Sequence, residues 1–434
     1  MTTRFGAITV LLLFLSSCSA YKLDSAQHSL RTSFAQQNYL GSAELLSKFQ
    51  KKKVYKSKDE VLFSLEQGAV NHFGRNYVES NIHFTQAEDQ IDLLYTKSIS
   101  RAIQSFLIND NSLAYDGEDY EDVYLNIFKT LNYIHLDELE SALVESRRIA
   151  YKLDQLNLKY HGLVEALSKA DTSGHATWKS GETNIQNSAL GHYLAAVLFA
   201  KTNKPDGARI EYENLLKSFR EQPSVYAFAA PDRYKLKQIT DPYSYNVLVT
   251  GFSGRAPQKI QHDSRLYLNG PDLYLKFSLP SLTMYNSQVA RVEVETPNGI
   301  TQPLSLIEEM DVVAREVYKV KEPIIYARTI VRAFIKAVGT NKLSREIGKE
   351  DAIMGDIANI LGKVGQEATE KADLRSWQTM PGKAYATVLN LPKGDHEVVI
   401  HYYGYDDQLL SSHSETINVT DQRSLTLVES LYWN

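Results

Sequence analysis

Three residues in the last part of the chain offer the clearest candidate for a binding site. Asp373, Arg375 and Trp377 alternate within one short segment. An arginine guanidinium is planar and can hold a carboxylate or a phosphate with parallel hydrogen bonds. An indole can stack on a sugar or on a guanidinium. The same residues could instead form a structural latch, in which Trp377 is buried and the Asp–Arg pair closes a helix-to-strand junction. Exposure of Trp377 separates the two interpretations.

The other residue types that commonly perform catalysis form no recognisable motif. The eleven histidines show no metal-binding spacing, and no His-Glu-x-x-His sequence occurs. Ser253 lacks the glycine placement of a nucleophile elbow, and no glycine-rich phosphate loop is present. Paired carboxylates at a catalytic distance stay open, because a sequence does not state distances. We therefore expect a protein that is not an enzyme and that has no catalytic residue, cofactor or metal.

A run of acidic residues lies near residue 120. A calcium-binding loop would be one interpretation of this run. Its members are Asp116, Glu118, Asp119, Glu121 and Asp122. The glycine stands at the wrong place for an EF-hand, which excludes that motif. The run instead predicts an exposed helix start, where carboxylates meet the positive end of the helix dipole.

The single cysteine, Cys18, follows a short apolar run at the N-terminus. Arg4 precedes apolar residues 8–15, and Ser16 and Ser17 stand directly before the cysteine. A membrane span needs about 20 apolar residues, so this run has the form of an export signal. It resembles the lipobox of bacterial lipoproteins, in which the cysteine is acylated. An ordinary secretory signal is the alternative, but no second cysteine exists to pair with Cys18.

The lipobox resemblance implies where the protein is located. It implies a lipoprotein signal peptide over residues 1–17 and a lipid anchor over residues 18–20, with acyl chains such as palmitate on Cys18. Ser19 follows the cysteine where an aspartate would favour the inner membrane. The resemblance therefore implies the outer membrane, on its periplasmic face. No later apolar stretch approaches membrane length, so the lipid would be the only anchor.

Length and composition indicate a multidomain globular protein. The 434 residues are 43% hydrophobic and 23% charged, and this length suggests two or more domains. The net charge is −5, with 47 basic and 52 acidic residues interspersed. This balance gives no reason to expect a nucleic-acid partner.

Residues 21–230 show helical periodicity and a weak internal repeat. Gly68 is followed by Ser80, Phe84 and Ala87 at offsets of 12, 16 and 19. A second copy has the same offsets and a third is weaker; they contain Ala196, Ala208, Tyr212 and Leu215, and Thr130, Ala142, Ser146 and Ile149. Ala43, after a turn at Gly41, is expected to belong to a fourth. The pattern resembles the tetratricopeptide repeat. Because the copies are not spaced at about 34 residues, we expect an irregular solenoid, with a generic helical bundle as the alternative.

Residues 241–434 are expected to form an α+β domain. Alternating apolar residues predict strands in an antiparallel sheet at 246–251, 266–268, 273–277, 290–294, 385–391, 397–403, 414–419 and 425–431. A helical insert is expected at about 305–366, with helices over residues 305–338 and 352–364. The fold class is therefore α + β multidomain, with an N-terminal tetratricopeptide-like α-solenoid before this domain.

Two segments carry a closer resemblance. Gly254-Arg255-Ala256-Pro257-Gln258-Lys259 and the segment 372–381 resemble a family of uncharacterised bacterial lipoproteins, often encoded beside a penicillin-binding-protein activator lipoprotein. Met380 departs from the leucine expected there. The association with the activator lipoprotein indicates a pathway and not an activity. The lipobox, the repeat pattern and the missing catalytic motifs lead us to expect a protein-binding scaffold or regulator in cell-envelope assembly, whose partner is a periplasmic or outer-membrane protein. The alternative is a peptidoglycan-binding or peptidoglycan-modifying protein that uses Asp373, Arg375 and Trp377.

Overall fold

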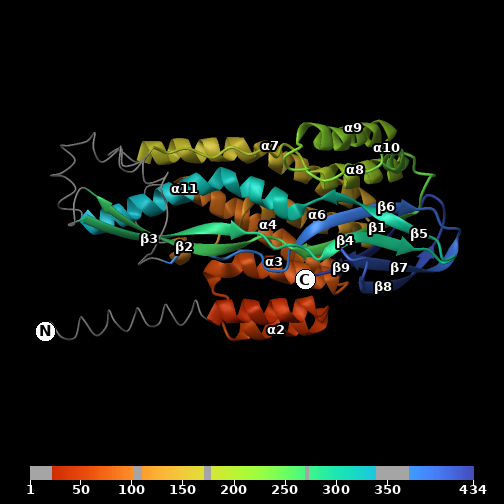
Figure 1. The fold of residues 1–434 in the computed structure, drawn as a ribbon, viewed down its shortest axis with the longest axis horizontal. Helices are drawn as coiled ribbons and strands as arrows, with labels where there is room; N and C mark the ends of the chain where they lie inside the picture. Colours follow the sequence, from red (N-terminus) through yellow and green to blue (C-terminus); the bar gives the residue numbers. More distant parts are fainter. Residues whose placement is uncertain (1–21, 101–109, 171–176, 269–272, 339–370) are drawn as a thin grey trace.

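The computed structural model describes residues 22–100, 110–170, 177–268, 273–338 and 371–434. In this mixed α/β structure, helices dominate up to residue 240 and strands dominate afterwards (Figure 1). Cys18, the signal peptide and anchor expected over residues 1–20, and the helix expected at 352–364 lie outside the described residues.

The first helix covers residues 22–35. The later helices are α2 (Tyr39–Lys51), α3 (Glu60–Phe73), α4 (Tyr77–Ser100), α6 (Asp119–His135), α7 (Leu139–Ala170), α8 (Ala189–Lys201), α9 (Pro205–Glu221), α10 (Arg233–Lys237) and α11 (Met310–Val338). Short 3₁₀ turns are η1 (Ser57–Asp59), η2 (Asp110–Ser112) and η3 (Gln238–Thr240).

The strands are β1 (Val247–Arg255), β2 (Gln258–Leu268), β3 (Leu273–Thr283), β4 (Val289–Glu295), β5 (Thr301–Glu308), β6 (Pro381–Leu389), β7 (Gly394–Gly404), β8 (Leu409–Val419) and β9 (Thr426–Tyr432). Seven of them form one sheet in the order β8-β7-β4-β5-β6-β1-β9, and β2 and β3 form a separate hairpin.

Four helical hairpins share one turn geometry. In each hairpin, three residues join the two helices. The pairs are helix 22–35 with α2, α3 with α4, α6 with α7, and α8 with α9. The middle residue of each turn has a positive φ between 57° and 63°: Gln37, Arg75, Asp137 and Asn203. The N–H of the next residue donates to the carbonyl five positions earlier in every turn, as from Asn76 to Asn71 at 2.8 Å. This is a Schellman-type helix end, repeated here without the usual glycine.

Close helix crossing within the second hairpin explains the small residue at position 68. A Cβ atom added to Gly68 would lie 2.5 Å from the ring of Phe84. The hydroxyl of Ser80 donates to the Gly68 carbonyl at 2.8 Å. The aromatic ring therefore fills the space that the missing side chain leaves between α3 and α4.

The turn of the first hairpin was expected at Gly41, and this position was wrong. The turn lies at residues 36–38, and Gly41 belongs to the first turn of α2, where Asn38 caps the helix by accepting from the Gly41 N–H at 2.9 Å. Measured from this turn, Ser42 is equivalent to Ser80. Ser42 is fully buried, whereas Ala43 is half-buried.

The large sheet is antiparallel among its described strands except where β1 pairs with β9 in parallel. The expected antiparallel sheet is therefore confirmed for the described pairings other than this one. The sheet curves strongly, so that its two ends meet: Tyr402 on β7 lies 2.6 Å from the hydroxyl of Ser430 on β9. Valines on β1, β4 and β9 share one core inside this curve.

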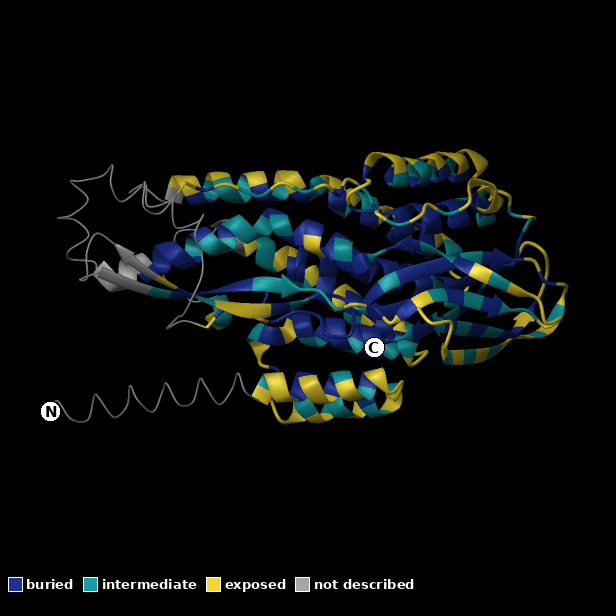
Figure 2. Ribbon diagram, viewed as in Figure 1, coloured by how far each residue is buried: buried dark blue, intermediate teal, exposed yellow. Residues whose placement is uncertain are grey.

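The boundary of the helical insert also differs from the expectation. Residues 301–308 form β5, and helix α11 begins at Met310 rather than near residue 305. β5 pairs with β6, so α11 lies in the chain between two strands that are neighbours in the sheet. The helix runs along the long axis of the molecule (Figure 1). The outer face of β1 and β6 joins the helices in one continuous core, which appears as the dark blue centre of Figure 2.

Candidate functional site

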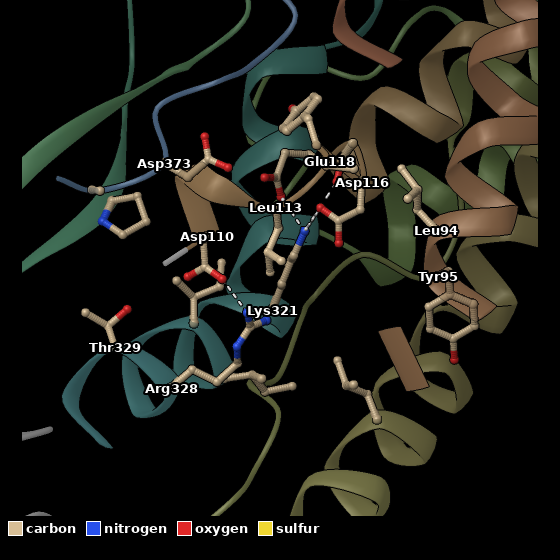
Figure 3. A pocket seen from close by; sticks show the side chains of 18 of the residues that line it. Leu94, Tyr95, Asp110, Leu113, Asp116, Glu118, Lys321, Arg328, Thr329 and Asp373 are labelled. Atoms are coloured by element: carbon tan, nitrogen blue, oxygen red, sulfur yellow. Dashed lines mark hydrogen bonds and ion pairs between the residues drawn. The ribbon is translucent and has the colours of Figure 1, made fainter. Parts of the chain in front are cut away.

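A cavity of about 250 Å³ lies among α4, α7, α11 and the β2–β3 hairpin. The segment 110–118 and residues 371–373 complete its lining. Side chains from these distant parts of the sequence converge in Figure 3. The cavity therefore depends on the packing of helical and strand regions against each other.

One side of the cavity is apolar. Its aliphatic residues come mainly from three helices and are Leu94, Leu113, Leu163, Leu167, Ile324 and Ile325. Leu167 and Ile324 are buried, and Leu163 and Ile325 pack as half-buried residues against the same core. This side can accommodate a hydrocarbon group without leaving a polar group unsatisfied.

The rest of the lining is strongly charged. Its seven basic residues are Lys97, Lys159, Lys259, Lys321, Arg328, Arg332 and Lys371. Its four acidic residues are Asp110, Asp116, Glu118 and Asp373. Among the described residues, Lys159, Lys259, Lys321 and Arg328 are each paired with a carboxylate, so ion pairs hold the charged part of the lining.

Helix α11 supplies both kinds of residue from a single face. Lys321, Arg328 and Arg332 are spaced by seven and four residues, and Ile324 and Ile325 lie between them. These spacings place the side chains on one face of a helix. Sequence reasoning predicted a helix over residues 305–338 but missed the cavity. The cationic spacing was the available signal.

The acidic start of α6 is buried rather than exposed, which corrects the expectation. Glu118 and Asp119 are at most 9% exposed. The Nζ atom of Lys321 lies 3.3 Å from Asp116 Oδ1 and 3.5 Å from Glu118 Oε2, and Lys259 also pairs with Glu118. Burial alone would lower the pKa of Lys321, but these neighbouring carboxylates raise it above its ordinary value. The acids therefore hold buried cations beside the cavity.

Lys159 is held in the same way from α7. Its Nζ atom lies 2.5 Å from Asp119 Oδ1 and over the ring of Tyr95 at 4.8 Å. Burial opposes the charged form, but the charges of Asp119 and Asp122 raise the pKa of this lysine. The ammonium therefore stays charged at the cavity wall at neutral pH.

Arg328 faces the cavity with part of its guanidinium unused. It pairs with Asp110, which also lies 3.6 Å from Arg332. The Nε atom of Arg328 is buried and has no hydrogen-bond partner among the described residues. One aspartate thus faces two guanidinium groups, and the unpaired N–H of Arg328 is buried inside the protein.

The structure places Asp373 and Arg375 together but leaves the arginine no accessible donor. Its Nε and Nη2 atoms donate to the carboxylate of Asp373, and its Nη1 atom donates to Asp59 at 3.0 Å. Nη1 and Nη2 also donate to the backbone carbonyls of Lys58, Asp110 and Leu113. Burial raises the pKa of Asp373, but the hydrogen bonds and charge of Arg375 lower it to about 2.

Trp377 is packed inside the protein. The residue is 2% exposed, and its ring makes edge contacts with Phe84 and Phe128 at 5.6 and 5.7 Å between centroids. Its backbone N–H donates to Glu121 at 2.6 Å. This is the geometry expected for a latch between the helices and the sheet, and it leaves no ring face for a sugar. Of the three residues, Asp373 alone lines the cavity.

A second polar cluster lies where the helical hairpins meet the sheet. A small cavity of about 50 Å³ is lined by His72, Arg75, His135, Glu415 and Glu429, among others. Within the described residues, no group of three or more histidine, cysteine, aspartate or glutamate side chains is arranged to hold a metal ion. This cluster joins two parts of the chain and is too small for an organic ligand.

Comparisons with protein-family models, with curated proteins and with solved structures found no match to this chain. Among the described helices, none combines the length and the apolar composition needed to cross a membrane.

Proposed function

We propose that this chain is a lipid-anchored protein of the bacterial cell envelope, facing the periplasm, that acts as a scaffold or regulator by binding a protein partner. The signal-like N-terminus and Cys18 support the anchor. The resemblance to a family of bacterial lipoproteins supports the envelope role. The helical hairpins, interpreted as tetratricopeptide-like repeats, would form the binding region.

The observation that carries the proposal is an exposed apolar residue repeated in three hairpins. Seven residues after the positive-φ residue of each turn stand Ile82, Val144 and Ile210. They are 45%, 54% and 49% exposed on α4, α7 and α9. Exposed β-branched residues do not stabilise a helix, so a repeated one is better explained by a docking surface.

The long helix α7 extends this surface. Val144, Tyr151 and Leu158 follow one another at intervals of seven residues and are all more than half exposed. Such spacing produces a stripe along one side of a helix, the form in which a partner helix is usually bound.

The anchor is tested by metabolic labelling with a palmitate analogue. The wild-type protein should incorporate the label and sediment with outer membranes, and Cys18→Ala should do neither. An unlabelled wild-type protein, or one recovered in the cytosol, would contradict the anchor.

The binding role is tested by placing a photoreactive amino acid at positions 82, 144 and 210 in living cells. Matched control positions are Ser412, Ser414 and Thr416, which are exposed on β8. We expect one envelope protein to be captured at all three helical positions and at none of the controls. Equal capture at the β8 positions, or none at the helical ones, would refute the proposal.

A further inference from the structure

The charged residues that line the cavity among α4, α7 and α11 are held in ion pairs. Every carboxylate of the lining and every cation that is not exposed faces an opposite charge; the pairs are Asp110 with Arg328 and Arg332, Asp116 with Lys321, Glu118 with Lys259 and Lys321, Asp119 with Lys159, and Asp373 with Arg375. The other two charged residues of the lining, Lys97 and Lys371, are exposed. A charged ligand would therefore find no unpaired counterion among the described residues inside the cavity, and it would lose the hydration of its own charge.

Three tyrosines of the lining also have their polar groups bonded within the protein. The hydroxyl of Tyr95 donates to the carbonyl of Lys159 at 3.0 Å, and that of Tyr115 donates to Glu121 at 2.7 Å. The hydroxyl of Tyr160 donates to Asp119. The rings therefore contribute apolar surface to the lining, together with the leucines and isoleucines, and this surface is what the cavity offers to a ligand.

The cavity is elongated along two helices. Lys159, Leu163 and Leu167 line it from α7 at intervals of four residues, which corresponds to about 12 Å at the helical rise of 1.5 Å per residue. On α11 the lining extends from Lys321 to Arg332. Both helices run along the long axis of the molecule (Figure 1). An apolar space of this form suits a hydrocarbon chain.

The volume sets the length of that chain. An apolar protein cavity of about 150 Å³ can hold a benzene molecule, which has six carbon atoms. The cavity here has about 250 Å³. By the same proportion it has room for on the order of ten carbon atoms.

We propose that this cavity binds an uncharged hydrocarbon chain of about ten carbon atoms. The chain lies between α7 and α11, against Leu163 and Leu167 on one side and Ile324 and Ile325 on the other. This site is separate from the exposed positions on which the partner-binding proposal rests, so either proposal can fail alone.

The test is calorimetric titration of the chain from Ser19 onward, which contains every described residue and lacks the acylated cysteine. The probes are the straight-chain alcohols hexanol, octanol, decanol and dodecanol, with octanoate and octylammonium as charged equivalents of octanol. We expect saturable binding of the alcohols, with an affinity that rises about fourfold per methylene group up to decanol. Dodecanol should gain nothing further, because the cavity is then full. Octanoate and octylammonium should both bind at least about tenfold more weakly than octanol.

Two variants locate the site. Ile325→Trp fills the cavity and should weaken octanol and decanol at least about tenfold. Leu163→Ala removes three carbon atoms from the wall, so dodecanol should bind this variant more tightly than decanol does. Ile300→Trp is the matched control, because Ile300 is 60% exposed and lies outside the cavity lining, and it should leave every affinity unchanged.

Three results would overturn the proposal: no saturable binding of octanol, binding of either charged probe as tightly as octanol, or unchanged alcohol affinities in a folded Ile325→Trp variant. An affinity that keeps rising from decanol to dodecanol in the wild-type chain would also contradict it, because unspecific partition has no length limit. Near-ultraviolet circular dichroism establishes that each variant is folded. If Ile325→Trp does not fold, the length series on the wild-type chain and on Leu163→Ala still decides the question.

Discussion

The Nε2 atom of His72 on α3 lies 2.5 Å from Oε1 of Glu429 on β9, and this bond joins the helical hairpins to the edge of the sheet. The Nδ1 atom of His72 lies 2.7 Å from Oδ1 of Asn132, whose amide nitrogen donates to Ser80 and Asn81. Because the amide nitrogen of Asn132 is a donor in both of these bonds, Oδ1 of Asn132 must accept a hydrogen bond from the Nδ1–H of His72. Burial raises the pKa of Glu429, but the charge and hydrogen bond of His72 lower it overall. The ring of His72 thus connects Asn132 on α6 with Glu429 on β9.

A second histidine beside this pair predicts acid sensitivity. Burial, with the nearby charges of His72 and Arg75, lowers the pKa of His135 from 6.5 to about 4. Between these values the unfolded chain binds a proton that the folded protein does not, so the contribution of His135 to stability falls as the pH falls from 6.5 to 4. The loss is about 3 kcal/mol at most.

Replacing His135 should flatten this dependence. The ring of His135 stacks on Tyr77 with 4.1 Å between centroids, and His135→Phe keeps that stacking. The measurement is urea unfolding at several pH values from 4.5 to 7.5. His161→Phe, at an exposed position on α7, is the control and should retain the wild-type slope. An unchanged slope in His135→Phe would refute the assignment.

A buried carboxylate on α3 predicts the opposite pH dependence. Glu66 is fully buried and accepts from the Gln378 N–H at 2.8 Å and from the Thr379 hydroxyl at 2.7 Å. Burial raises its pKa from 4.5 to about 7 despite these bonds. The folded protein binds the extra proton between these values, so this contribution to stability decreases as the pH rises from 4.5 to 7.

Glu66→Gln should therefore stabilise the protein by about 1–3 kcal/mol at pH 8 and change little at pH 5. The amide can still accept from the Gln378 N–H and contact Thr379. Glu60→Gln, exposed on the same helix, should show no such difference between the two pH values. A Glu66→Gln protein that is less stable than wild type at pH 8 would contradict the prediction.

The close crossing of α3 and α4 predicts opposite effects for two glycine substitutions. Gly68→Ala should destabilise the protein by about 1–3 kcal/mol, because its Cβ would meet the Phe84 ring at 2.5 Å. Gly162→Ala on α7 should stabilise it by about 0.5–1 kcal/mol, since nothing lies within 4 Å of the added Cβ. Thermal and urea unfolding measure both.

The double variant Gly68→Ala/Phe84→Leu tests the mechanism. The smaller side chain should recover part of the stability lost in Gly68→Ala, so the two changes should not be additive. Additive losses would show that the clash with Phe84 is not the cause.

The latch predicts that lysine cannot replace Arg375. The guanidinium group donates hydrogen bonds to Asp59, to Asp373 and to three backbone carbonyls, and the side chain is 6% exposed. A lysine would leave part of this buried set unpaired, at a cost of about 3 kcal/mol in the free energy of unfolding. Arg209→Lys, at an exposed position on α9, should leave the urea midpoint unchanged. Equal midpoints for both variants would exclude the latch.

The sequence by itself determined the helical hairpins and most strands of the sheet. The spacing of apolar residues indicates which side of a helix or strand is buried. The small residues at positions 68 and 80 indicate where two helices cross closely. It assigned residues 305–308 of β5 to a helix and placed the first turn at Gly41 instead of residues 36–38, because alternation and helical spacing overlap over short segments.

Only the tertiary structure decided which charges meet. Sequence reasoning treated the acidic start of α6 as exposed, but Lys259 and Lys321 arrive there from β2 and α11 and neutralise it. The same packing buries Trp377 and opens the cavity between Leu94 and Asp373. Periodicity describes one element at a time, whereas a buried ion pair or a cavity depends on the topology that brings separate elements together.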